Sequence, residues 1–350
     1  MVYSRIIGTG SYIPDHRTLR NEDLEAMLKE SFPDDPEKWT SDEWIIKRTG
    51  IKERRISGPK ETNASMGTEA LRKALENSDI SPDKLDMIIV ATNTNEKNFP
   101  ACGGEIQHEL GAKCGFFDVQ AGCTGFIYGL SIGDAFIKSE QYDTVAIVGT
   151  DKLSAITDYK DRETCVLFGD MASSFILQKS NDPGIIKNVL KGKGLGRDNI
   201  GLTSPDIDRL KERVKNIQTG PIYTTGQGYL FMNGREVFKF ATNALPEVCL
   251  DVIKDTGYTI KDVKKIFPHN ANLRIIESAA NKLARKIDVD NEIMQGRFYH
   301  NIDKYGNASA ASNANSFNEA LTSGIIKKGD LVILAGFGAG LTYGASALIV

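Results

Sequence analysis

Three residues in this chain have side chains suited to acyl chemistry, and each stands where a strand should give way to a helix. Cys123 follows the apolar run 116–120, His269 follows an apolar run that ends at Pro268, and Asn307 opens an Ala- and Ser-rich segment. A cysteine attacks as its thiolate, which the positive end of a helix dipole favours. We therefore expect Cys123 to be a nucleophile with a lowered pKa.

Each of these residues also has an ordinary structural interpretation. Cys123 could be a buried structural cysteine, His269 a core histidine with its hydrogen bonds satisfied, and Asn307 a helix N-cap. A neutral imidazole and an amide can, however, both donate hydrogen bonds to a developing negative oxygen. The glycine-rich segment 336–340 either aims backbone N–H groups at such an oxygen or forms a tight turn between two strands.

Composition narrows the class of protein. The 350 residues carry a formal net charge of -3, which disfavours a nucleic-acid-binding role. The five cysteines include no Cys-x-x-Cys pair, so we expect free thiols and a cytoplasmic location. No apolar run approaches the roughly 20 residues that a membrane span requires. The histidines and cysteines lack metal-ligand spacing, so we expect no metal site.

The expected elements repeat along the chain. Strands with apolar residues on both faces indicate an α/β protein whose sheets are covered by helices. In both halves two strands precede a junction residue, Cys123 or Asn307, and a helix and a further strand follow it, which suggests a duplication. The expected strands are 86–92, 116–120 and 144–149 in the first half, and 265–268, 298–302 and 331–335 in the second.

We expect an N-terminal half over residues 1–190, an irregular connecting excursion over 191–228, and a C-terminal half over 229–350. Two prolines predict a loop over 30–39. After it, the residues from Thr40 to Glu43 predict the start of a short helix. In the helix after Cys123, glycines at 125, 129 and 133 share one face, which indicates very close packing against another backbone.

With these residues identified, the sequence resembles the β-ketoacyl-[acyl carrier protein] synthase III family of the thiolase-like superfamily. The resemblance covers nearly the whole chain and implies a five-layered αβαβα fold built from two duplicated βαβαβαββ halves, as a homodimer. The segments that carry it are 40–51, 118–123, 168–170, 268–276 and 305–312.

The resemblance implies a role for each residue at the junctions. Cys123 would carry the acyl group, while His269 and Asn307 would bind the thioester oxygen of a malonyl group. The backbone N–H groups of Cys123 and of Ala339, in the glycine-rich turn, would form an oxyanion hole. Trp44 and Arg162 would sandwich the adenine of coenzyme A (CoA).

Further residues are implied around the substrate. Arg48 would lie near the CoA phosphates, and Asn272 would help to orient His269 and the ligand. Phe238 and Phe337 would line the tunnel, and Phe99 would close the acyl pocket of the partner subunit. A basic face would dock the acidic acyl carrier protein (ACP), although a solvated helix surface explains the same charges. Its residues are Lys239, Arg274, Lys282 and Arg285.

The chain also departs from the family pattern. Gly122 and Thr124 flank the nucleophile where alanine is common, and Ala339 replaces a glycine. Arg235 and Asn270 replace other polar residues at the tunnel, and the chain has additions around 30–39 and 287–300. These differences leave open the acyl-chain preference and the second substrate.

The expected activity is a decarboxylating Claisen condensation of an acyl-CoA with malonyl-ACP or malonyl-CoA, in fatty-acid or related polyketide biosynthesis. It would pass through an acyl-Cys123 intermediate and need no cofactor. An alternative is a thiolase-like acyltransferase of specialised metabolism that moves the acyl group to a non-malonyl acceptor. A papain-like protease shares the Cys, His, Asn order, but its local signature around the cysteine is absent.

Overall fold

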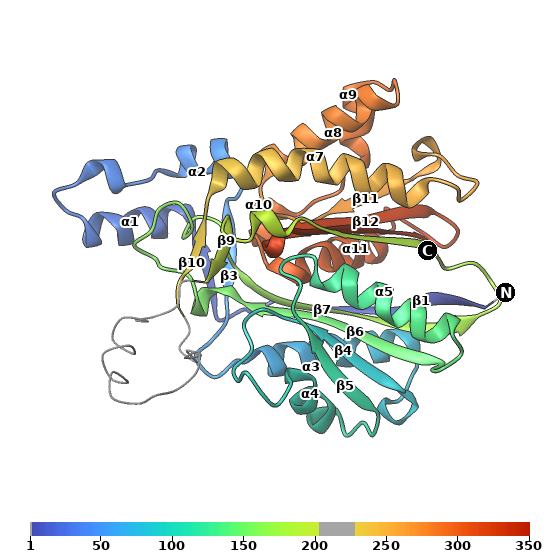
Figure 1. The fold of residues 1–350 in the computed structure, drawn as a ribbon. Coiled ribbons are helices and arrows are strands. Elements are labelled where there is room, and N and C mark those ends of the chain that lie inside the picture. The colour runs from blue at the N-terminus through green and yellow to red at the C-terminus, as the bar shows by residue number, and fades with distance from the viewer. Residues whose placement is uncertain (1, 203–227) are drawn as a thin grey trace, which may run out of the picture.

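The computed structural model describes residues 2–202 and 228–350, which form two large β-sheets, with helices between and outside them, and two small two-stranded sheets (Figure 1). The first sheet has the strand order β1-β7-β6-β4-β5 and the second β11-β12-β13-β8. The first-sheet strands are β1 Tyr3–Tyr12, β4 Met87–Ala91, β5 Gly115–Val119, β6 Thr144–Lys152 and β7 Asp170–Ser180. The second-sheet strands are β8 Ile185–Gly192, β11 Lys265–Pro268, β12 Leu331–Gly338 and β13 Thr342–Ile349.

The two sheets repeat one pairing scheme. β4 pairs parallel with β6, which pairs antiparallel with β7, and β7 pairs antiparallel with β1. In the second sheet β11 pairs parallel with β12, which pairs antiparallel with β13, and β13 pairs antiparallel with β8. The predicted α/β fold of two repeated halves is therefore confirmed.

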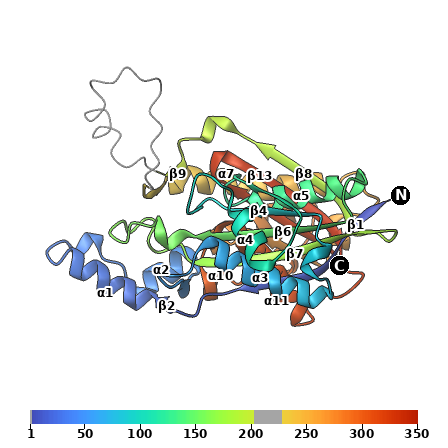
Figure 2. The same cartoon turned by 90° about the horizontal axis from the view of Figure 1, so that it is seen from below.

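Helices complete the layers. α5 (Gly125–Lys138) and α11 (Ser312–Thr322) each contact strands of both sheets and so lie between them. The outer face of the first sheet carries α3 (Asn63–Ser78) and α4 (Cys102–Leu110) (Figure 2). The outer face of the second carries α7 (Gly234–Ile253), against which α8 (Leu273–Lys286) packs. The result is the expected αβαβα sandwich.

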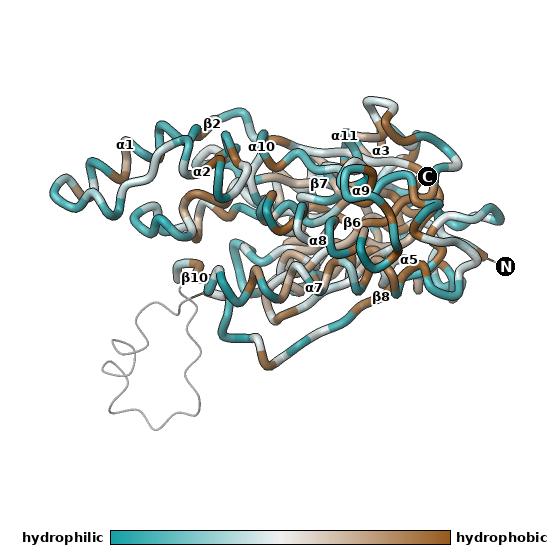
Figure 3. The backbone as a smooth tube through the Cα atoms, turned by 90° about the horizontal axis from the view of Figure 1, so that it is seen from above, coloured by the Kyte–Doolittle hydropathy of each residue, from teal (hydrophilic) through white to brown (hydrophobic). Residues whose placement is uncertain are grey.

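Aromatic rings join the two sheets through the central layer. Phe126 of α5 lies 4.9 Å from Phe175 of β7, whose ring lies 5.0 Å from Phe317 of α11. Phe317 in turn lies 5.4 Å from Phe267 of β11. All four side chains are buried, so apolar burial fixes both central helices against both sheets. Figure 3 shows the hydrophobic segments gathered in this body of the molecule.

The glycine face of α5 packs closely, but against side chains. A Cβ on Gly129 would lie 3.1 Å from Ile147 Cγ2, and one on Gly125 would lie 3.0 Å from Ala91 Cβ. The expectation of another backbone as the partner was therefore wrong. The close approach brings the start of α5, and Cys123 before it, down onto β4 and β6.

One expected strand is not formed. Residues 298–302 contribute an isolated parallel bridge between Phe298 and Ile266, and the chain then enters α10 (Ile302–Tyr305). The side chain of the buried Asn301 accepts from the Asn270 amide and donates to the Glu319 carboxylate. These bonds hold the chain away from the sheet edge. The bridge occupies the place that β5 takes beside β4 in the first half.

The remaining segments flank the two sheets. The N-terminal part forms β2 (Arg17–Arg20), α1 (Asn21–Ser31) and β3 (Glu53–Ile56), with the predicted short helix as α2 (Asp42–Thr49). The Ser41 side chain caps α2 by accepting from the Trp44 N–H. The other short elements are 3-10 turns, α9 Asn291–Arg297, and the paired strands β9 Ile200–Leu202 and β10 Leu230–Met232.

Most of the expected excursion over 191–228 lies outside the described residues. Because β8 pairs with β13, we propose that the chain is best divided between β7 and β8, with β8 in the C-terminal half. Across 2–202 and 228–350, no helix is long and apolar enough to cross a membrane.

A buried arginine ties the N-terminal segment to the body. Arg54 of β3 is fully buried, and its guanidinium donates to the Leu19 and Val166 carbonyls and to Asn21 Oδ1. Burial lowers its pKa to about 10. These bonds hold the segment that carries α2 against the loop before β7.

Replacing this guanidinium should destabilise the protein. We expect Arg54→Met to lower the free energy of unfolding by about 3 kcal/mol, because two carbonyls and the Asn21 amide lose a buried charged partner. Urea denaturation followed by circular dichroism measures this. The control is Arg72→Met, at an exposed arginine 3.4 Å from Glu69, which should cost less than about 0.5 kcal/mol. Equal losses in the two variants would contradict the structural role.

Candidate active site

One narrow cavity of about 90 Å³ brings the three expected residues together. Cys123, His269 and Asn307 all line it, although they lie far apart in the sequence. Most of its other walls are apolar, as a tunnel for an acyl chain requires. The other lining residues are Leu167, Ile200, Met232, Gly234, Val237, Phe238, Ala271, Asn272, Ile275, Phe337, Gly338 and Leu341.

The expected nucleophile, Cys123, stands just before α5, as predicted, but its electrostatics differ from the prediction. Cys123 is half-buried and lines the cavity. Burial raises the pKa of Cys123 to about 12, and its hydrogen bond with Ser309 offsets only part of this. The prediction of a lowered pKa was wrong because desolvation of the thiolate outweighs the stabilising groups around it.

The two backbone segments proposed as an oxyanion hole touch one another. A Cβ on Gly338 would lie only 2.4 Å from the Cys123 nitrogen, so only glycine lets the end of β12 approach the nucleophile this closely. In the reciprocal contact, a Cβ on Gly122 would lie 2.6 Å from the Ala339 nitrogen, and Gly122 has a φ of +57°. Both candidate amide donors therefore stand at one backbone crossing beside the sulfur.

The histidine is buried and neutral. His269 follows β11, where its backbone N–H donates to the Ala335 carbonyl at 2.8 Å, and only 1% of its surface is exposed. Burial lowers the pKa of His269 to about 3, with a smaller opposing effect from the Ser309 backbone. Its ring lies edge-on to Phe337, with centroids 5.4 Å apart. At neutral pH the imidazole can therefore donate a hydrogen bond without carrying a charge.

Asn307 is oriented by its own loop. Its backbone N–H donates to the Leu167 carbonyl at 2.9 Å, and its Oδ1 accepts from the Ser309 N–H at 2.9 Å. The side chain thus caps the following turn, as its structural interpretation requires. Because the oxygen is engaged in this bond, the NH₂ group is the end of the amide available to a ligand in the cavity.

Ser309 was missed by the sequence reasoning. Its hydroxyl donates to Cys123 Sγ at 3.5 Å, its N–H donates to Asn307, and its backbone contacts His269. It contacts all three residues because it adopts a φ of +48°, which is unusual for a residue with a side chain. In an Ala- and Ser-rich run, only its position two residues after Asn307 could have singled it out.

The residues expected to hold CoA gather on α2 and the loop before β7. The guanidinium carbons of Arg48 and Arg162 lie 4.5 and 4.6 Å from the centre of the Trp44 ring. Asn272 caps α8 and donates to the Arg48 carbonyl at 3.1 Å, which joins this group to the wall of the cavity. The structure thus brings Trp44, Arg48, Arg162 and Asn272 to one side of the cavity.

The expected tunnel residues divide into two groups. Phe238 and Phe337 line the cavity, and the Arg274 guanidinium lies 5.8 Å from the Phe238 ring centre. Phe99 does not line the cavity of its own chain and is 85% exposed. Its expected role in a partner subunit stays a prediction.

The basic residues expected to dock ACP lie on α7 and α8. Lys239, Arg274 and Arg285 are exposed, whereas Lys282 is half-buried. Lys282 donates to Thr242 and Asn243 side chains, so it holds the two helices together. The contribution of each residue to docking stays a prediction.

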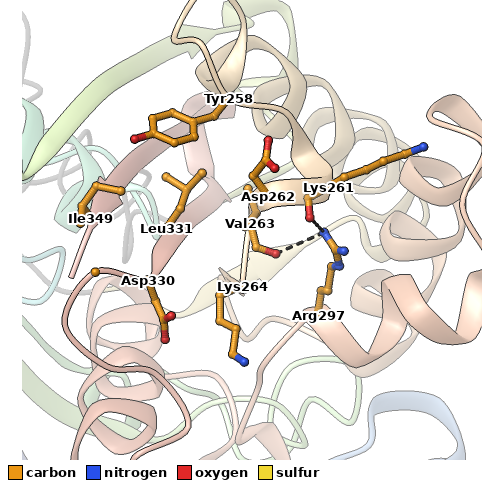
Figure 4. A pocket seen from close by; sticks show the side chains of 10 residues that line it. Tyr258, Lys261, Asp262, Val263, Lys264, Arg297, Asp330, Leu331 and Ile349 are labelled. Atoms are coloured by element: carbon orange, nitrogen blue, oxygen red, sulfur yellow. Dashed lines mark hydrogen bonds between the residues drawn. The ribbon is translucent and has the colours of Figure 1, made fainter.

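Another hollow, of about 440 Å³, lies away from this site. Figure 4 shows its side chains, among which Lys261 and Lys264 point in different directions. Arg297 donates to the carbonyls of Ile260, Lys261 and Val263, so its guanidinium is engaged. Among the residues that the structure describes, no cysteine, serine or histidine lines this hollow, and we assign it no chemistry. In the described part of the chain, no cluster of His, Cys, Asp and Glu could hold a metal ion.

Known proteins match this fold and sequence. Two models of 3-oxoacyl-[acyl-carrier-protein (ACP)] synthase III match, over residues 117–194 and, for its C-terminal part, over 253–350. Beta-ketoacyl-[acyl-carrier-protein] synthase III of Caldanaerobacter subterraneus subsp. tengcongensis is 41% identical over 350 residues, which cover 98% of this chain and 96% of that protein.

Solved structures of condensing enzymes are similar to this fold over nearly the whole chain. The synthase III structure from Aquifex aeolicus has a TM-score of 0.84 and 39% identity, with 99% of this chain and 100% of that one covered. The priming β-ketosynthase of the R1128 polyketide pathway has a TM-score of 0.86 and 32% identity, with 99% and 96% covered.

This fold and these matches make the chain a thiolase-like condensing enzyme, an acyltransferase. It belongs to the β-ketoacyl-[acyl-carrier-protein] synthase III family. The resemblance inferred from the sequence is therefore confirmed.

The backbone crossing gives a direct test of the oxyanion hole. We expect Gly338→Ala to slow acylation of Cys123 by about 100-fold or more, because its Cβ would displace the Cys123 amide. Acyl transfer followed by intact-mass spectrometry measures this rate. Ala339→Gly is the matched control and should acylate at nearly the wild-type rate, since the backbone donor remains. Unimpaired acylation in Gly338→Ala would contradict the assignment.

The buried imidazole should make stability depend on pH. The folded-state pKa of His269 is about 3 and the unfolded value is about 6.5, so between these values the unfolded chain binds more protons. The stabilisation is complete above pH 6.5 and is lost as pH falls toward 3. We expect the loss between pH 6.5 and 5 to be roughly 1.5 kcal/mol larger for wild type than for His269→Asn. Urea denaturation at each pH tests this, and parallel curves would contradict it.

Proposed function

We propose that this enzyme condenses an acyl group held on Cys123 with a malonyl thioester, which loses carbon dioxide. The observation that carries the proposal is the convergence of Cys123, His269 and Asn307 in one mostly apolar cavity. Cys123 attacks the acyl thioester, CoA leaves, and the covalent acyl-enzyme divides one difficult reaction into two easier steps.

The second half-reaction needs hydrogen-bond donors. Loss of carbon dioxide leaves an enolate, whose oxygen His269 and the Asn307 NH₂ group stabilise. A neutral histidine suits this role because its buried N–H donates without needing a counter-ion. The enolate carbon attacks acyl-Cys123, and the amides of Cys123 and Ala339 hold the new oxyanion.

The residues that bind CoA and the carrier protein lie at the entrance of the cavity. Trp44 and Arg162 take the adenine of CoA, Arg48 lies near its phosphates, and Asn272 orients the ligand beside His269. The exposed charges of Lys239, Arg274 and Arg285 attract an acidic carrier protein, whose phosphopantetheine arm enters the cavity. Lys282 supports this surface through its bonds to α7.

The proposed biological setting follows from this chemistry. The enzyme works as a cytoplasmic homodimer in which Phe99 closes the acyl pocket of the other subunit. It needs no prosthetic group, since the thiol and the hydrogen-bond donors supply the chemistry. Acyl-CoA and malonyl-ACP, or malonyl-CoA, are its substrates, and its β-ketoacyl product enters fatty-acid or related polyketide synthesis.

Intact-mass spectrometry tests both half-reactions. We expect wild type to gain one acyl mass from an acyl-CoA panel and to lose it with malonyl-ACP, which yields a β-ketoacyl product. Cys123→Ala should gain no mass. His269→Ala and Asn307→Ala should still acylate but decarboxylate malonyl thioester about 100-fold or more slowly, because each lacks a donor to the enolate.

Two results would reject the proposal. An adduct that forms equally on Cys123→Ala would exclude this nucleophile. An adduct that malonyl thioesters leave unchanged, but that an alcohol or amine removes, would identify a transferase with a different acceptor.

A further inference from the structure

A buried carboxylate lies close to the nucleophile and has no part in the mechanism above. Asp151, near the end of β6, has no exposed surface and does not line the cavity. It accepts from the Asn93 N–H at 2.7 Å and from the Thr94 hydroxyl at 3.1 Å, with the Ala310 N–H at 3.4 Å. A buried carboxylate is costly even when its oxygens are hydrogen-bonded. One this near a reactive thiol calls for a functional explanation.

Ser309 connects this carboxylate to the sulfur. The Ser309 hydroxyl lies 3.5 Å from Cys123 Sγ, to which it donates, and the same side chain hydrogen-bonds Asp151. A hydroxyl carries a single hydrogen, so for the relay that hydrogen turns to Asp151 and Oγ accepts from the thiol. The Asn93 amide, which also bonds Asp151, donates to Ser309 Oγ at 3.3 Å. The left-handed backbone of Ser309 is strained for a residue with a Cβ, and such strain persists where surrounding contacts enforce it.

Attack by Cys123 requires an acceptor for its proton. Burial raises the pKa of the thiol, so little thiolate exists at neutral pH. His269 is a weak base, because burial holds its pKa at about 3. Among residues 2–202 and 228–350, the side chain that hydrogen-bonds Cys123 Sγ is that of Ser309. This hydroxyl is therefore the side-chain group placed to take the proton.

We propose that Ser309 and Asp151 relay the Cys123 proton during acylation. As Sγ bonds to the acyl carbon, its S–H bond breaks and the proton passes to Ser309 Oγ, while the Ser309 proton passes to the Asp151 carboxylate. The C–S bond of the donor thioester then breaks, and its electron pair leaves with the CoA sulfur. That thiolate takes back the proton from Asp151 through Ser309, so no net charge or electron is gained.

The two residues have different roles. Ser309 touches the reacting sulfur and is a catalytic residue, whereas Asp151 acts through it and is a positioning residue. The titratable groups that interact with Asp151 are the thiols of Cys123, before α5, and Cys102, at the start of α4. The donors to its carboxylate come from uncharged residues. Burial raises the pKa of Asp151, which makes it a better proton acceptor than an exposed carboxylate.

The test separates acylation from decarboxylation. Single-turnover acylation of the full chain by acyl-CoA is followed by intact-mass spectrometry from pH 6 to 10. We expect Ser309→Ala and Asp151→Asn to acylate about 100-fold more slowly at pH 7, with rates that recover as pH rises and the thiol ionises unaided. Pre-acylated enzyme should decarboxylate malonyl thioester within about threefold of wild type, since that step needs no base.

Conservative and matched variants control for structure. Ser309→Thr keeps the hydroxyl but must place a branched Cβ at the same positive φ, so it should restore part of the acylation rate. Ser312→Ala removes another buried hydroxyl from the same segment, one that accepts from the Ala308 N–H, and should leave the pH profile of acylation unchanged. Should Asp151→Asn fail to fold, Ser309→Ala with Ser309→Thr decides the question.

The inference rests on the proposed function, and its failure is distinguishable from failure of that function. If wild type does not acylate on Cys123, the proposed function falls. If wild type acylates and Ser309→Ala matches its rate and pH profile, only the relay is rejected. The relay is also rejected if both half-reactions of Ser309→Ala slow equally and the pH profile of acylation does not shift. Faster acylation by Asp151→Asn would overturn it too, because the carboxylate would then only disfavour the thiolate.

Discussion

The backbone crossing between Cys123 and Gly338 is the contact on which the site depends. Cys123 belongs to the first half of the chain and the glycine-rich turn to the second, and their main chains meet without intervening side chains. The Thr124 and Thr342 hydroxyls, 3.0 Å apart, connect the same two segments. Because both sheets pack on α5 and α11, the shared core fixes the relative position of the two segments.

Burial governs the electrostatics of the cavity more strongly than the helix start does. It keeps the imidazole of His269 uncharged, which suits a hydrogen-bond donor for an enolate, but it also opposes ionisation of the Cys123 thiol. One environment therefore favours the second half-reaction and hinders the first. The proposed relay resolves this conflict, because it accepts the proton of the thiol without placing a charge in the cavity.

The sequence predicted the architecture and the convergence of Cys123, His269 and Asn307 in one cavity because their signals are local. Apolar strand runs and the repeated order of elements predicted both sheets. The expected strand-to-helix junctions indicated the three residues, although Asn307 follows α10 rather than a strand. The pKa of Cys123 could not be predicted, since it depends on neighbours from the other half of the chain. The contacts of Ser309 and the missing strand at 298–302 likewise depend on tertiary hydrogen bonds that composition does not reveal. Phe99 concerns a second subunit, which a single chain cannot define.

The Trp44 ring lies between two cation–π partners, the guanidinium groups of Arg48 and Arg162. Under the proposed function, the adenine of CoA would exchange one of these cation–π contacts for a stacking contact. The net gain is therefore smaller than the bound contacts alone would suggest. Under the proposed function such an exchange would favour rapid release, so that one thioester could leave before the next binds.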